Sequence, residues 1–182
     1  MQMCWRHIIV NTKSTWLHGD PRGFRNRDHR IHSSGDYKNP PPPTEHAGLF
    51  NWMNERAGPP EFMEDSWLPL ILDAYKARLT KEGFCVVAIS AGKAHAHSLT
   101  LLPDEPSTVK LIVGRCKRNM CEAIKKFHTG PLWAGGGEYK RVTTLSHFVN
   151  VINYIAKQDK SFVWADEDAR RDPVRRFAPD PA

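Results

Sequence analysis

Two short apolar segments joined by a tight turn constrain the fold of this chain more than any other feature. The segments "FCVVAIS" (84–90) and "HAHSLTLL" (95–102) are typical of buried strands. The few residues between them allow only an antiparallel pair. Helical patterns flank the pair, one at 65–83 and one at 103–128. A hairpin between two helices is the centre of a split βαβ unit.

Three further elements complete this unit. Strands are predicted at 5–12 and 138–143, and a third helix at 144–158. The order β-α-β-β-α-β-α predicts an α+β fold, namely a ferredoxin-like split βαβ antiparallel sheet with two helices on one face. The last helix is an addition at the C-terminal end, and it carries Tyr154.

The regular pattern is interrupted once and then ends. Residues 17–64 are rich in Pro and Gly and contain the arginines Arg22, Arg25, Arg27 and Arg30, and we expect a long insertion that is functional or disordered. We predict one domain over residues 1–164. The charged tail, residues 165–182, is expected to be disordered.

The charge of the chain favours a polyanionic partner. The net charge is +6 and the pI is about 9.3, which suits nucleic acid, although many proteins are mildly basic. The four cysteines lack CxxC spacing and predict no disulfide framework. No signal peptide or membrane span is indicated, so we expect a cytoplasmic protein.

His95 and His97 are a candidate metal site. Side chains alternate along a strand, so the two imidazoles project from the same face and can share one cation. With nine histidines in 182 residues, a chance pair is the alternative interpretation.

The third helix adds two polar candidates. Tyr154 and Gln158 are four residues apart and lie on one helical face, away from the predicted apolar stripe. A half-buried interface tyrosine is the alternative interpretation.

Paired histidines on a strand, followed by a helix with "NYIAKQ", resemble the HUH superfamily of single-strand nucleases. The similarity is greatest to its single-tyrosine transposases of the insertion-sequence and repeat-associated type. The resemblance implies that His95, His97 and Gln158 bind Mg²⁺ or Mn²⁺. It implies that Tyr154 attacks single-stranded or hairpin DNA and forms a 5′-phosphotyrosine. It also implies a homodimer, in which the tyrosine helix of one subunit can complete the site of the other. The small Ala96 and the preceding "GKA" depart from the pattern of many relatives and leave the substrate open.

Basic residues in the insertion, in the second helix and on the fourth strand are candidates for binding the DNA backbone. They are Arg22, Arg25, Arg27, Arg115, Lys117, Arg118, Lys125 and Lys140. For the helix lysines, a solvated surface is an equally good interpretation.

Two other functions remain open. The chain can be an inactive or domesticated nucleic-acid-binding module on the same scaffold. The insertion can also hold a zinc site built from His18, His29, His32 and His46. His147 is a candidate general base, and the sequence does not give the DNA target.

Overall fold

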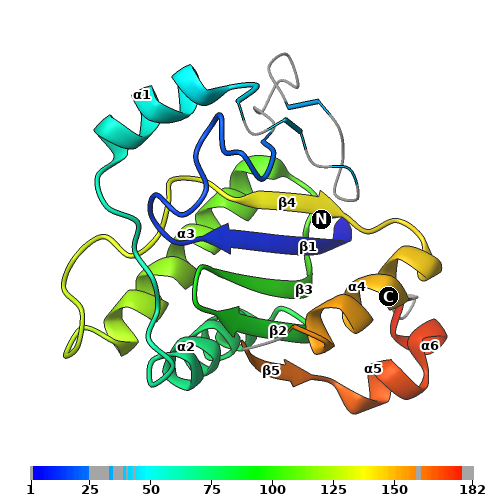
Figure 1. The fold of residues 1–182 in the computed structure, drawn as a ribbon. Coiled ribbons are helices and arrows are strands. Elements are labelled where there is room, and N and C mark those ends of the chain that lie inside the picture. The colour runs from blue at the N-terminus through cyan, green and yellow to red at the C-terminus, as the bar shows by residue number, and fades with distance from the viewer. Residues whose placement is uncertain are drawn as a thin grey trace.

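The fold is built on one five-stranded antiparallel sheet. The structure is a computed structural model that describes residues 2–24, 33–34, 39, 41–42, 44–158 and 161–177. The strand order is β4-β1-β3-β2-β5 (Figure 1). The strands are β1 (Met3–Asn11), β2 (Val86–Gly92), β3 (His95–Pro103), β4 (Glu138–Arg141) and β5 (Ser161–Ala165).

Helices cover both faces of this sheet. Helices α2 and α3 pack together against one face, and α4 packs on β2 and β3 from the other. Helices α5 and α6 continue beside α4, whereas α1 lies apart from these layers (Figure 1). The helices are α1 (Ala47–Ala57), α2 (Leu68–Lys81), α3 (Pro106–Ala123), α4 (Leu145–Ala156), α5 (Glu167–Arg171) and α6 (Pro173–Phe177).

The predicted α+β class with an antiparallel sheet is confirmed. The first four strands have the order β4-β1-β3-β2, with α2 and α3 as the crossovers on one face, which is compatible with a ferredoxin-like split βαβ. Helix α4 is the additional helix.

Three segments differ from the sequence-based expectation. Helix α1 lies inside the insertion, where the sequence predicted no helix, and none of its residues is buried. Strand β5 pairs with the otherwise free edge of β2. Part of the expected disordered tail forms α5 and α6: Ala169 is fully buried, and Trp5 Nε1 donates to the carbonyl of Phe177 over 3.1 Å. These contacts join residues that are far apart in the sequence, so the charged composition of the tail could not predict them.

Strand β3 divides its side chains between two separate cores. Ser98 lies on the α2 side, where its hydroxyl is 2.9 Å from that of Tyr75, and Ala96 and Leu102 belong to the same core. Leu99 faces the other way and packs with Trp5 and Phe148 against α4. Because residues two apart share a face, His95 and His97 lie on the α4 side of the sheet.

Within the described residues, no helix is both long enough and apolar enough to cross a membrane.

Candidate metal and tyrosine site

His95 and His97 lie together at the start of β3, as the alternation of side chains predicts. Their ring centroids are 4.7 Å apart, with the rings nearly perpendicular. His97 is buried, with 2% of its surface exposed, and His95 is half-buried. One imidazole is therefore fixed in the interior, while the other borders solvent.

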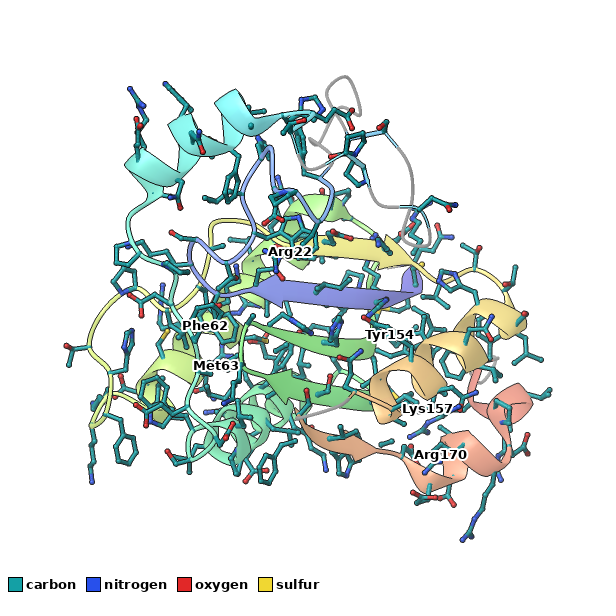
Figure 2. The ribbon with its side chains drawn as sticks, in the orientation of Figure 1. Arg22, Phe62, Met63, Tyr154, Lys157 and Arg170 are labelled. Atoms are coloured by element: carbon teal, nitrogen blue, oxygen red, sulfur yellow. The ribbon has the colours of Figure 1, made fainter. Side chains whose placement is uncertain are left out.

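Helix α4 brings Tyr154 to these histidines. The helix begins after Thr144, whose hydroxyl accepts a hydrogen bond from the backbone N–H of His147. The ring centroid of Tyr154 is 5.4 Å from that of His97, and the side chain lies between α4 and the sheet (Figure 2). Half of the Tyr154 surface is exposed, so one ring edge contacts His97 while the side chain remains open to solvent.

Gln158 follows the end of α4 and reaches the other histidine. Burial lowers the pKa of His95, and a side-chain hydrogen bond with Gln158 offsets part of this effect. The four candidates His95, His97, Tyr154 and Gln158 therefore meet within one chain.

His7 on β1 is a member of the site that the sequence analysis missed. Its Nε2 is 3.1 Å from Nδ1 of His97, and its ring centroid is 5.9 Å from that of Tyr154. Strand β1 pairs with β3 so that Ile9 faces His97, which makes His7 a diagonal neighbour on the same face. The only signal in the sequence is a polar residue inside the apolar segment "WRHIIV". This signal can be interpreted only when the pairing of β1 with β3 is known, because His7 and His97 are 90 residues apart in the sequence.

Burial keeps the two interior imidazoles neutral. It is the main reason that the pKa of His97 falls to about 3 and that of His7 to about 4, and the nearby Lys140 ammonium contributes to both values. At neutral pH each ring therefore has one nitrogen with a free lone pair, as metal ligation requires.

The chemistry of the donors fits one divalent cation. In the part of the chain that the structure describes, the buried Nε2 of His97 has no hydrogen-bond partner, and such an unsatisfied buried group is uncommon. A ligand set of two imidazoles and the Gln158 amide would leave positions free for other oxygen ligands. The same described residues contain no group of three His, Cys, Asp or Glu side chains placed to hold a metal.

The alternative zinc site in the insertion has only two members within the described residues. The ring of His18 lies 5.7 Å from that of Phe24, and the ring of His46 lies 5.0 Å from the same phenylalanine. His29 and His32 lie outside the described residues.

Among the predicted DNA-binding residues that the structure describes, Lys140 lies on the same face of the sheet as the histidines. It is paired with His7 across β1 and β4, so both side chains lie on the α4 face of the sheet. Its side chain is 58% exposed and its ammonium is 2.7 Å from a carboxylate oxygen of Glu138. A phosphate that approaches the histidines would therefore come near this positive charge.

The other basic candidates are divided between different parts of the chain. Arg115, Lys117 and Arg118 lie on α3 and Lys125 lies just after it, on the opposite side of the sheet from the histidines. Arg115 is bound to Glu82, and Lys117 donates to the carbonyls of Ala134 and Gly136. In the insertion, Arg22 is paired with Asp20 and lies over the Trp16 ring, while Arg25 and Arg27 lie outside the described residues.

The candidate general base does not lie beside the phenol. His147 and Tyr154 are two turns apart on α4, which separates their Cα atoms by about 10 Å. His147 lies instead close enough to His7 to lower the pKa of that residue slightly.

No protein-family model and no curated protein matches the chain. Among solved structures, the chain is similar to a REP-associated tyrosine transposase bound to a REP hairpin. The two share 12% sequence identity with a TM-score of 0.41, over 97% of this chain and 82% of the other. A TM-score at this level does not establish a common fold, so the function of this chain is inferred from its own side chains.

Proposed function

We propose that the chain is a metal-dependent single-strand DNA endonuclease and strand transferase that uses one tyrosine as its nucleophile. One observation carries the proposal. The half-exposed phenol of Tyr154 lies against His97, whose buried Nε2 has no partner among the described residues. A phenol can supply the nucleophile for attack on a phosphodiester, and an available imidazole lone pair can bind the metal ion that assists the attack.

His95, His97 and Gln158 are the residues that would hold Mg²⁺ or Mn²⁺. The ion, when bound, would polarise the scissile phosphate and neutralise charge that develops during attack. All three ligands are uncharged at neutral pH, so the positive charge of the site is not cancelled by the protein. Mixed nitrogen and oxygen ligation suits Mn²⁺ better than Mg²⁺.

The chemical step is a transesterification. The oxygen of Tyr154 attacks phosphorus and loses its proton to solvent, and a 5′-phosphotyrosine bond forms. The bond from phosphorus to the 3′ oxygen breaks, and that oxygen takes up a proton and leaves as a hydroxyl group. Because the phosphodiester becomes another phosphodiester, an incoming 3′-hydroxyl can reverse the step and join two strands without a nucleotide cofactor.

Single-stranded or hairpin DNA is the substrate that we propose, because the backbone must bend to expose phosphorus for attack in line. Lys140 would contact the phosphate backbone at the site, and we propose that it contributes both affinity and salt dependence. The basic residues on α3 would bind DNA only if the DNA strand extends around the protein to the opposite face of the β-sheet.

The proposal is tested by covalent trapping. The purified protein is incubated with a single-stranded hairpin oligonucleotide and Mn²⁺, and a denaturing gel separates free protein from the adduct. Wild-type protein should form the adduct, and Tyr154→Phe should not. Tyr139→Phe is the matched control, since this half-buried tyrosine packs with the core on the α2 and α3 side. An adduct that persists in Tyr154→Phe refutes the assignment of the nucleophile.

A second outcome separates catalysis from binding. If wild-type protein binds the hairpin but forms no adduct with either Mn²⁺ or Mg²⁺, the chain is a nucleic-acid-binding module and the proposed enzyme is wrong. Light scattering in the same buffer tests the proposed homodimer. Mixing Tyr154→Phe with His97→Ala protein then separates cis from trans attack, because only attack in trans restores adduct formation in the mixture.

A further inference from the structure

The hydrogen bond between His7 and His97 determines which nitrogen of His97 is available to bind a metal. Nε2 of His7 and Nδ1 of His97 are 3.1 Å apart, and the two rings are stacked at an angle of 30°. Both rings are buried, and two facing ring nitrogens at this distance share one proton, which belongs to one ring or the other.

The two positions of this proton have different consequences at the far side of His97. If His7 donates, Nδ1 of His97 is the acceptor, and Nε2 of His97 carries a buried N–H. In the described chain this N–H would have no acceptor, and it could not bind a cation. If His97 donates instead, its Nε2 carries a lone pair that can bind one. A neutral histidine ligand requires the second arrangement.

We propose that His7 is a positioning residue that fixes the tautomer and the ring orientation of His97. The proposal rests on the proposed function, because it takes His97 as a metal ligand. Nε2 of His7 accepts a hydrogen bond from the Nδ1–H group of His97. This leaves Nε2 of His97 unprotonated, and it prevents a flip of the His97 ring. The second ring nitrogen of a metal-binding histidine is commonly held by a carboxylate, a carbonyl group or water. Here a second imidazole has that position, and it brings no negative charge into a buried site.

The first test needs no metal. Two-dimensional ¹H–¹⁵N NMR at neutral pH assigns the protonated nitrogen of each imidazole in the metal-free full-length protein. We expect His97 protonated at Nδ1 and His7 unprotonated at Nε2. In His7→Phe, which keeps an aromatic ring beside Tyr154 but removes the acceptor, His97 should lose this single tautomer. Finding Nε2 of His97 protonated in wild-type protein overturns the proposal.

The second test measures Mn²⁺ binding by isothermal titration calorimetry. Loss of such a supporting hydrogen bond commonly lowers metal affinity about 10- to 100-fold. We expect a loss of about that size for His7→Phe. His7→Gln should retain most of the affinity, because its amide oxygen can accept the same proton. His128→Phe is the matched control, because this histidine lies beside Trp67 on the α2 and α3 side, and the variant should bind as wild-type protein does.

The outcomes separate the two proposals. If wild-type protein binds Mn²⁺ and forms the DNA adduct while His7→Phe binds Mn²⁺ equally well, only the role of His7 is wrong. If His7→Gln loses as much affinity as His7→Phe, hydrogen-bond acceptance is not the reason and the role of His7 is again wrong. If wild-type protein does not bind Mn²⁺ at all, the metal-dependent function is wrong, and the role of His7 falls with it.

Discussion

The position of Tyr154 depends on how firmly α4 is packed on the sheet, and Phe148 is the residue with which to test this. The Phe148 side chain is fully buried. Its ring makes edge contacts with Trp5 on β1 and with Phe177 on α6, at centroid distances of 4.9 and 5.4 Å. One side chain therefore joins α4 to the sheet and to the C-terminal helices.

Phe148→Ala should destabilise the protein by about 3–5 kcal/mol. The substitution removes a buried aromatic ring and leaves a cavity between Trp5 and Phe177, which these two rings cannot fill. For a chain of this length, each kcal/mol shifts the melting temperature by about 2–4 °C. The expected decrease is therefore about 6–20 °C. Phe148→Leu, which keeps most of the buried volume, should lose less.

Thermal unfolding followed by circular dichroism measures this effect in metal-free buffer. Leu111→Ala is the matched control, since Leu111 is 64% exposed on α3 and should change stability by no more than about 0.5 kcal/mol. Below its melting temperature, Phe148→Ala should form less DNA adduct than wild-type protein, even after correction for the fraction of unfolded molecules, because α4 no longer holds Tyr154 firmly in place. A loss of stability below about 1 kcal/mol would show that α4 is not packed on the sheet as described.

Two further predictions concern charged residues. Lys140→Gln should weaken hairpin binding and reduce the slope of log affinity against log salt by about one, measured by fluorescence anisotropy. The same change at Arg118, on the far side of the sheet, should leave that slope unchanged if the DNA contacts only the α4 face. Hydrogen bonds from Arg115 and Arg78 hold the pKa of Glu82 below its ordinary value. The stability that this carboxylate contributes is present above its unfolded pKa and is lost as the pH falls through the folded pKa. Urea unfolding between pH 7 and pH 3 should therefore show a smaller acid loss for Glu82→Gln, and an identical loss would contradict the ion pair.

Several elements of this protein follow from local sequence alone. The strands β2 and β3 are short apolar runs with few residues between them, and α2 and α3 have apolar residues at helical spacing that are buried as expected. The alternation of a strand places His95 and His97 on one face before any partner strand is known. These features depend on neighbours in the chain, which is why periodicity reveals them.

Only the tertiary structure decided which other side chains reach that face. His7 joins the site because β1 pairs with β3 in one particular register, and a shift by one residue would turn its ring toward α2 and α3. The same packing placed the basic residues of α3 behind the sheet and kept Lys140 beside the histidines. Strand β5 pairs with the free edge of β2, and α5 and α6 of the tail cover an apolar surface of α4. Contacts between residues far apart in sequence depend on register and packing, and composition and periodicity describe neither.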